Sequence, residues 1–188
     1  MAEQYTRKAI RNEFMHQLTQ KPLNKITVTS IVANCHLNRN TFYYYYKDIY
    51  DLLKDILNEE LEKLIAYSEE MNSWEDGFIK GLHIILNNRN VAYNLHHSEH
   101  KELLHSYLFE SAGIVIERAI AMYPEAADAK PSDIELLTLF YQCALTELVE
   151  QWLETNMTLD GESIIHRIAQ LLDKNLERSL LISIKLDE

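Results

Sequence analysis

Apolar residues recur every three or four positions along most of the chain, and this spacing restricts the fold more than any other feature. Ile10, Phe14 and Leu18 lie four residues apart, and residues 28–35 carry the i, i+3, i+4, i+7 pattern. Such spacing gathers side chains on one face of an α-helix. Glycine and proline, which mark the turns of β-proteins, number only four and three. The sequence therefore predicts an all-α fold of about nine helices.

Polar residues predict where individual helices begin, because their side-chain oxygens accept hydrogen bonds from the first unpaired amides of a helix. Thr27, Asn38 and Asp48 each precede a helical pattern in the first third of the chain. Later helices are expected after Ser73, after Ser98, at the Pro131-Ser132 pair with Glu135 as a capping box, and after Asp160. The last two helices are expected at about 132–155 and 160–183.

These last two helices are rich in Leu, Ile, Phe and Trp, more than one buried helix face needs. We expect them to form a homodimer interface, although both faces can instead be buried within one chain. The two cysteines, Cys35 and Cys143, lie far apart and have no CxxC spacing. Each is interpreted as a small buried apolar side chain.

Charge is distributed unevenly along the chain. The net charge is −11, yet residues 1–54 hold eight basic and four acidic residues, so that segment is +4 and the remainder −15. A basic segment on an acidic body is typical of a protein that meets DNA at one end, and chance segregation of surface charge is the alternative. No stretch reaches the ~18 consecutive apolar residues of a membrane span, and no signal peptide is evident. We therefore expect a cytoplasmic protein without membrane contact.

The most specific signal is the run ITVTSIVANCHLNRNTFYYYYKDIYDLL, residues 26–53. A helix that follows Thr27 is joined by a short turn at residues 35–37 to a second helix capped by Asn38. Two short helices joined so tightly must cross steeply, which projects the second helix outward. Phe42 and Tyr46 lie four residues apart on that helix and are expected in the core beneath it. The run predicts a helix-turn-helix.

This run resembles the DNA-binding segment of TetR/AcrR-family transcriptional regulators, specifically over residues 5 to 55 or so. The matching positions are Ile26, Thr27, Val28, Ile31, Ala33, Leu37, Arg39, Thr41, Phe42, Tyr43, Tyr46, Lys47, Asp48, Leu52 and Leu53. Two positions depart from the pattern: His36 stands where the family usually has Gly, often with positive φ, and Asn40 where a small residue is common. The C-terminal half is similar to the Firmicutes-type subgroup. The resemblance implies a DNA-binding domain at residues 1–47 and a helical regulatory and dimerisation domain at residues 48–188.

A recognition helix reads base edges in the major groove while flanking groups hold phosphates. The candidate DNA-binding residues are Thr27, Asn38, Arg39, Asn40, Thr41, Tyr43, Tyr44, Tyr45 and Lys47. Arg39 has the donors for a bidentate hydrogen bond to guanine, and the Asn40 amide can form a pair of hydrogen bonds with adenine. Tyr43 suits a thymine methyl group. Phosphate contacts are expected from Thr27, Thr41, Tyr44, Tyr45 and Lys47.

The resemblance also implies a ligand pocket in the second domain. Its aromatic candidates, each equally interpretable as core, are Trp74, Phe78, Tyr93, Tyr107, Phe109 and Tyr141. A separate stretch, HHSEHKELLH, holds His96, His97, His100 and His105. A metal pair at i and i+4 there requires an unbroken helix, and Ser98 as a cap would break it. We therefore expect no metal and no cofactor, and the lack of motifs such as GxxxxGK or HExxH argues against an enzyme.

Together these features predict a DNA-binding transcriptional regulator, most simply a repressor. It is expected to bind a palindromic operator as a homodimer and to be released by a ligand in the C-terminal domain. A small-molecule effector or a partner protein can supply that signal. The alternative is a protein-interaction co-regulator that has a TetR-like fold and does not bind DNA alone.

Overall fold

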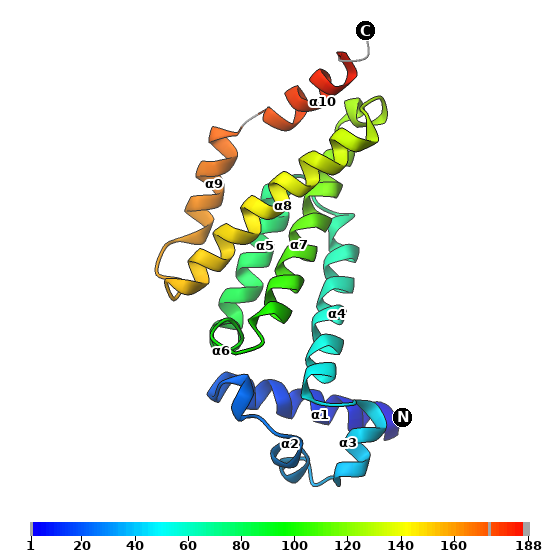
Figure 1. The fold of residues 1–188 in the computed structure, drawn as a ribbon, viewed down its shortest axis with the longest axis vertical. Coiled ribbons are helices and arrows are strands. Elements are labelled where there is room, and N and C mark those ends of the chain that lie inside the picture. Colours follow the sequence, from blue (N-terminus) through cyan, green and yellow to red (C-terminus); the bar gives the residue numbers. More distant parts are fainter. Residues whose placement is uncertain (1, 173, 186–188) are drawn as a thin grey trace. The chain divides into compact units, whose positions relative to one another are not determined.

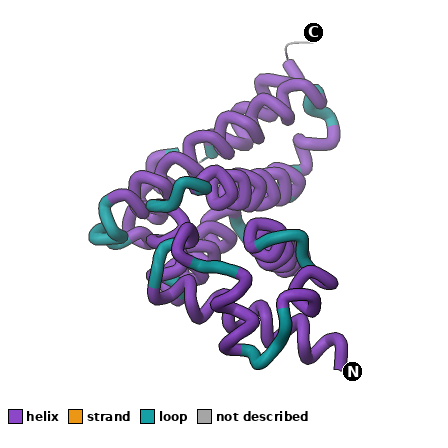
Figure 2. The backbone as a smooth tube through the Cα atoms, turned by 60° about the horizontal axis from the view of Figure 1, so that its bottom comes forward, coloured by secondary structure: helices purple, strands orange, loops and turns teal. Residues whose placement is uncertain are grey.

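The computed structural model describes residues 2–172 and 174–185, which form helices and connecting loops without strands (Figures 1 and 2). The predicted all-α fold is confirmed. The helices are α1 (Ala2–Gln20), the 3-10 helix η1 (Leu23–Lys25), α2 (Val28–Asn34), α3 (Arg39–Tyr45), α4 (Ile49–Ser68), α5 (Trp74–Asn87), α6 (Arg89–His96), α7 (Lys101–Ala121), the 3-10 helix η2 (Pro124–Ala127), α8 (Pro131–Glu154), α9 (Gly161–Leu171) and α10 (Asn175–Lys185). Among the described residues, no helix combines the length and hydropathy that a membrane span requires.

The chain divides into two compact units, and both are discontinuous in sequence. Unit 1 comprises Met1–Glu60 and Asn87–Leu104, and unit 2 comprises Leu61–Leu86 and His105–Glu188. This division differs from the domain boundary expected between residues 47 and 48. Unit 1 contains the whole helix-turn-helix together with the beginning of α4 and all of α6.

The core of unit 1 is built on α1. Ile10, Phe14 and Leu18 are fully buried, as their four-residue spacing predicted. Helix α6 packs against α1, and the Asn94 amide donates a hydrogen bond of 2.8 Å to the Leu18 carbonyl oxygen. Carbonyl groups in the last turn of a helix lack partners within the helix, so Asn94 fastens α6 to the end of α1.

In unit 2, α8 crosses α7 obliquely (Figure 1), and the Gln142 side-chain amide of α8 donates to the Phe109 carbonyl oxygen of α7 at 2.8 Å. Leu145, Val149 and Leu153 on α8 are buried, as are Ile116 and Ile120 on α7. These side chains form the apolar core on which the unit depends.

Two of the expected helix starts are wrong. Helix α8 begins at Pro131 itself, after Lys130 as N-cap, so Ser132 lies inside the first turn. Proline suits the first helical position because it has no amide hydrogen to satisfy. The Lys130 amide instead donates to the Ser183 hydroxyl of α10 at 3.1 Å. Ser98 does not cap α7 directly; its hydroxyl donates to the Leu95 carbonyl oxygen at 2.8 Å and closes α6.

The expected last helix, 160–183, is interrupted. Asp160 does cap its start by accepting from the Ser163 amide, but α9 ends at Leu171 and α10 begins at Asn175. Lys174 has a φ of 61°, outside the helical region. The interruption allows α10 to pack on η2 and α8.

Candidate nucleic-acid interface

The turn between α2 and α3 has the geometry of a tight helix end. His36 has a φ of 55°, as its place in the family pattern led us to expect. The His36 amide donates to the Ala33 carbonyl and the Leu37 amide to the Val32 carbonyl, at 3.3 and 2.8 Å. These two bonds define a Schellman motif, in which one left-handed residue ends a helix. The motif explains how a connection of four residues, 35–38, can redirect the chain into α3.

Both helices of the motif are capped as predicted. Thr27 and Ser30 form a reciprocal capping box at the start of α2. The Asn38 side chain accepts a hydrogen bond of 2.8 Å from the Thr41 amide, and the Thr41 hydroxyl also donates to Asn38 at 3.1 Å. Asp48 accepts from the amides of Tyr50 and Asp51, each at 2.9 Å. The starts of α2 and α3 are therefore stabilised by hydrogen bonds of Thr27, Asn38 and Thr41.

Helix α3 separates its aromatic residues between two faces. Phe42 and Tyr46 are 0% and 4% exposed, so the prediction that they support the helix from behind is confirmed. Tyr43 and Tyr44 are 49% and 72% exposed, and Tyr45 is half-buried. Since each residue advances ~100° around a helix, four consecutive tyrosines cannot share one surface.

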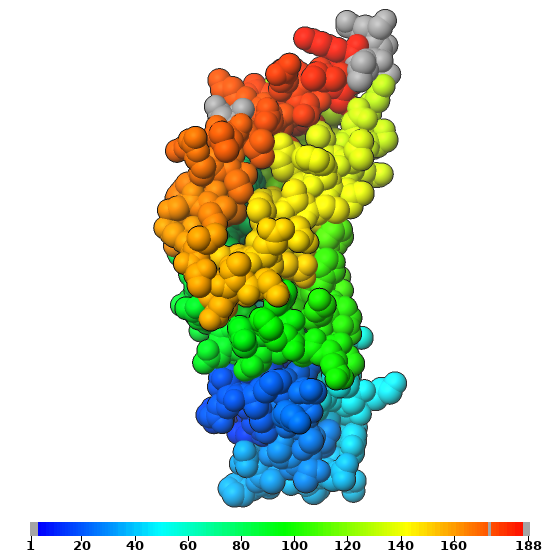
Figure 3. All heavy atoms as spheres, turned by 60° about the vertical axis from the view of Figure 1, so that its left-hand side comes forward, coloured from blue at the N-terminus to red at the C-terminus, as the bar shows by residue number. Residues whose placement is uncertain are grey.

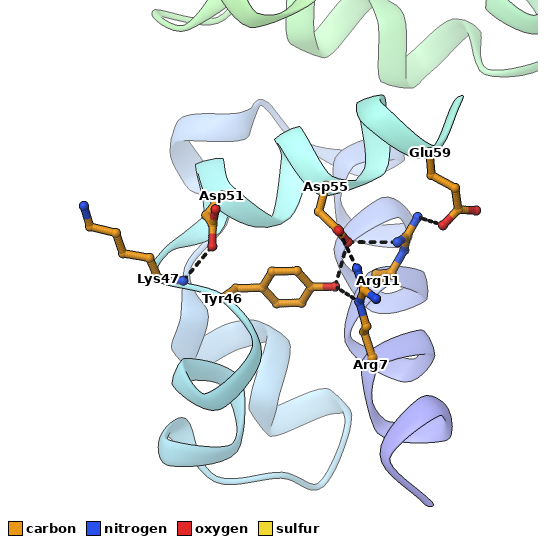
Figure 4. Close-up of polar contacts among 7 residues, drawn as sticks. All are labelled: Arg7, Arg11, Tyr46, Lys47, Asp51, Asp55 and Glu59. Carbon is orange, nitrogen blue, oxygen red and sulfur yellow. Dashed lines mark hydrogen bonds and ion pairs between the residues drawn. The ribbon is translucent and has the colours of Figure 1, made fainter. Parts of the chain in front are cut away.

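The outward face of α3 also carries Arg39 and Asn40, both exposed at its first turn. The Arg39 guanidinium lies 6.0 Å from the centre of the Tyr43 ring, and its Nη2 donates to the Tyr43 hydroxyl at 3.4 Å. This i, i+4 pair keeps the guanidinium on the helix surface, with further donors available. Lys47 is exposed beyond the end of α3, and its side chain points away from the neighbouring polar groups (Figure 4).

Behind α3, a polar network joins three helices around the carboxylate of Asp55 on α4 (Figure 4). The Tyr46 hydroxyl donates to Asp55 at 3.0 Å, and Arg11 of α1 donates to it at 2.8 Å. Arg7 of α1 pairs with Asp55 and donates through Nε to the Tyr46 hydroxyl at 3.1 Å. Arg11 also pairs with Glu59 at 2.6 Å. Tyr46 follows α3 directly, so the network ties the end of α3 to α1 and α4.

The network shifts the ionisation of its members. Burial raises the pKa of the Tyr46 phenol, and the hydrogen bond to Asp55 raises it further, although the Arg7 guanidinium opposes this. The hydrogen bond to Tyr46 also raises the pKa of Arg7. At neutral pH the phenol is therefore protonated and donates to Asp55.

This network was missed at the level of sequence, and it changes the charge argument. Arg7 and Arg11 counted toward the basic first segment, but both are in ion pairs with α4 carboxylates. Unit 1 as a whole has ten basic and nine acidic residues, a net charge of +1, and unit 2 is −12. The i, i+4 spacing of the arginine pair, and of Asp55 with Glu59, was the only local signal.

The six aromatic pocket candidates do not come together. Phe78 and Tyr107 line a cavity of about 60 Å³ in unit 2, and Trp74 and Tyr141 line a separate hollow. Tyr93 belongs to unit 1, where its ring stacks on His97 at 4.1 Å. Phe109 lines neither cavity and stacks on His105.

The histidine-rich stretch is split between two helices. His96 ends α6, whereas His100 precedes α7, and its ring lies tilted against the Tyr50 ring with the ring centres 4.1 Å apart. His105 pairs with Glu150 of α8 at 3.1 Å. In the described part of the chain, no three His, Cys, Asp or Glu side chains gather as a metal site would require.

Comparison with known proteins identifies the family. A sequence profile described as the transcriptional regulator C-terminal region of the TetR type (TetR_C_8) matches residues 72–174, more than half of the chain. The chain belongs to the TetR family of transcriptional regulators. The matched segment lies C-terminal to the helix-turn-helix, so the profile and the residue 26–53 pattern are separate indications of the same family. No curated protein matches the sequence of this TetR-family regulator.

A solved structure has the same fold. The dihydroxyacetone kinase operon activator DhaS superposes with a TM-score of 0.70, covering 96% of this chain and 97% of that chain. The two sequences are 16% identical. At that identity the TetR-family regulator shares the architecture of DhaS.

Proposed function

We propose that this TetR-family regulator is a DNA-binding repressor that binds a palindromic operator as a homodimer and is released by a ligand held in unit 2. Such a protein acts on DNA and is expected in the cytoplasm. The observation that carries the proposal is the outward face of α3. Its exposed guanidinium, amide and phenol groups have the chemistry that reads base edges and holds phosphates.

Homodimerisation is supported by the surface of the C-terminal helices. Leu136 and Phe140 of α8 are each 65% exposed, and Leu139 and Cys143 are exposed beside them in the same i, i+3, i+4, i+7 pattern. The expectation that Cys143 is buried is therefore wrong. Atoms of α8 and α9, in yellow and orange, make up one face of unit 2 (Figure 3). A second copy would remove this apolar stripe from water, and two copies would present two recognition helices to one palindrome.

Ligand release is supported by the cavity in unit 2. Leu64, near the end of α4, lines it together with residues of α5, α7 and α8. Helix α4 begins in unit 1 behind the recognition helix. A ligand that prefers one position of α4 would change the affinity for DNA through that difference in binding free energy.

Titration of the purified protein with a labelled duplex from its own upstream region tests DNA binding. We expect a complex of two chains per duplex whose affinity falls steeply with salt, and higher transcription of the adjacent gene when the protein is deleted. Lower transcription on deletion would instead make it an activator, the role for which DhaS is named.

The near-neutral charge of unit 1 favours one alternative, a co-regulator that needs a partner protein to bind DNA. The same titration separates the two functions. If this protein alone forms a complex with DNA at low salt, the co-regulator function is excluded. If a complex forms only when a second protein is added, the function of a repressor that binds DNA by itself is excluded.

A further inference from the structure

The first residue of α3, Arg39, contacts the side chain of Tyr43, which lies four residues later on the exposed face of the helix. We propose that Tyr43 is a positioning residue, which holds the Arg39 guanidinium in the orientation that reads a base. The base preference at that point of the operator then belongs to the pair and not to Arg39 alone. The proposal rests on the DNA binding proposed above and deepens it at one base pair of each half-site.

The contact between the two side chains has an electrostatic part and a hydrogen bond. The Arg39 guanidinium carbon lies 6.0 Å from the centre of the Tyr43 ring, within the range over which an aromatic ring attracts a cation. Nη2 of Arg39 also donates to the Tyr43 hydroxyl at 3.4 Å, a long hydrogen bond. Residues four apart in a helix lie on the same face, so the geometry of α3 brings these two groups together.

The contact restrains the guanidinium without neutralising it. Arg7 and Arg11 are held by carboxylates of α4, whereas no ion pair among the described residues includes Arg39. An aromatic ring attracts a cation without cancelling its charge. Arginine has five N–H donors, and Tyr43 accepts from one of them. The positive charge and the other donors remain available for a bidentate contact with a base.

The Tyr43 ring is itself supported by the core beneath α3. Its centre lies 5.7 Å from that of the Phe42 ring, and the two planes meet at 88°, an edge-to-face arrangement that aromatic rings prefer. Phe42 is fully buried and also contacts the Tyr46 ring, with the centres 5.8 Å apart. The Tyr46 hydroxyl donates to Asp55 (Figure 4). Three aromatic side chains therefore connect Arg39 with the charged network behind the helix.

The next residue, Tyr44, is arranged differently and supplies a matched control. Its side chain is 72% exposed, and its ring packs against that of Tyr45, with the centres 4.9 Å apart. Successive residues of a helix point ~100° apart, so Tyr44 and Tyr43 project in different directions. The two tyrosines have the same chemistry on the same helix, and the contact with Arg39 is made by Tyr43.

Restraint of the guanidinium favours base reading over phosphate contact. A free arginine side chain samples many rotamers, and the entropy lost when it is fixed on a base opposes binding. A guanidinium that is already oriented loses less, and a bidentate contact with guanine depends on the direction of its plane. A phosphate contact carries no sequence information. Loss of Tyr43 should therefore reduce discrimination between bases more than it reduces total affinity.

The test is selection of bound duplexes from a randomised pool by the full-length protein and its variants, followed by sequencing. Arg39→Ala first identifies the base pair that Arg39 reads. At that base pair, discrimination should fall about threefold in Tyr43→Phe, which loses the hydroxyl, and about fivefold in Tyr43→Leu, which also loses the ring. Tyr44→Phe should leave the base preference unchanged at every position, although its affinity for all duplexes falls alike.

A double-variant cycle separates positioning from direct reading by Tyr43. If Tyr43 acts through Arg39, Tyr43→Phe should have no further effect on base preference once Arg39→Ala is present. Additive effects in the double variant, or a change at a different base pair, would overturn the inference and show that Tyr43 reads a base itself. Unchanged base preferences in both Tyr43 variants would overturn it as well.

NMR relaxation of the Arg39 Nε atom in the free protein tests the restraint without DNA. We expect its order parameter to fall in Tyr43→Leu and to stay unchanged in Tyr44→Phe. An equal order parameter in the wild type and both variants would overturn the inference and leave the proposed function intact. A lower order parameter in Tyr43→Leu, together with no duplex selected by the wild type, would overturn the proposed function and the reading role, while the contact itself would stand.

Discussion

Helices α3 and α8 both expose large side chains, yet the two surfaces differ in chemistry. Tyr43 and Tyr44 on α3 end in hydroxyl groups and stand beside exposed Arg39 and Asn40. Leu136 and Phe140 on α8 are about as exposed and have no hydrogen-bonding atom. Exposure alone therefore does not indicate the partner. The polar groups of the α3 side chains can form hydrogen bonds either with water or with DNA. The apolar side chains of α8 are stabilised only when they are removed from water.

The two helices also differ in the buried residues that support them. Helix α3 rests on Phe42 and on the charged network of Asp55 with Tyr46. Helix α8 rests on an apolar core that includes Leu145 and Leu153. A polar support fixes direction as well as position, because hydrogen bonds and ion pairs have preferred geometries. Such a support suits the role proposed for α3, in which the helix aligns with base edges.

The largest effect is expected on the α8 surface. Leu136→Asp combined with Phe140→Asp should convert the proposed dimer to a monomer, because two carboxylates per chain would have to be desolvated at its interface. We expect the dimer dissociation constant to rise at least a thousandfold, about 4 kcal/mol, as measured by analytical ultracentrifugation. The matched control is Tyr43→Ala with Tyr44→Ala, which should leave the dimer intact. An unchanged dimer in the aspartate variant would place the interface elsewhere.

The polar support of α3 is tested by Asp55→Asn. The amide cannot accept charge-assisted hydrogen bonds from both arginines, so the free energy of unfolding should fall by about 2–3 kcal/mol, as measured by urea denaturation. Asp51→Asn is the control, since Asp51 accepts a hydrogen bond of 2.9 Å from the Lys47 amide and is not part of the network with Arg7 and Arg11. For this variant we expect the free energy of unfolding to fall by less than about 1 kcal/mol. Similar losses in both variants would argue against a special role for the network.

The reading surface of α3 is tested by Arg39→Ala. Loss of a bidentate contact should lower specificity at one base pair of each half-site by about 1–2 kcal/mol, as measured by competition among single-base operator variants. Lys47→Ala is the comparison: it should weaken all duplexes alike and reduce the salt slope by about one. If both variants lose affinity equally on every duplex, Arg39 contacts phosphate and does not read a base.

The smallest effect concerns alkaline pH. The pKa of Tyr46 is raised above its ordinary value of 10.0, first by burial, so folding favours the protonated phenol. This contribution to stability is complete below about pH 10 and is lost as pH rises further. As the pH rises from about 9 to 11, the wild type should therefore lose stability relative to Tyr46→Phe. A pH-independent difference would show that the phenol does not titrate with unfolding.

Much of unit 1 was predictable because its determinants are local. The spacing of Ile10, Phe14 and Leu18 specified a buried helix face, and the caps Thr27 and Asn38 specified where α2 and α3 begin. The positive φ of His36 followed from its place in the turn pattern. Each of these depends on residues within about one helical turn, which a sequence displays directly.

The sequence by itself determined an all-helical chain, the helix-turn-helix and the division of α3 into a buried and an exposed face, because short-range periodicity and capping dictate them. Only the tertiary structure decided that Arg7 and Arg11 pair with Asp55 and Glu59, and that the Ser183 hydroxyl accepts a hydrogen bond from the Lys130 amide. These features arise where segments distant in sequence meet. Their free energies depend on contacts and burial that no local spacing specifies.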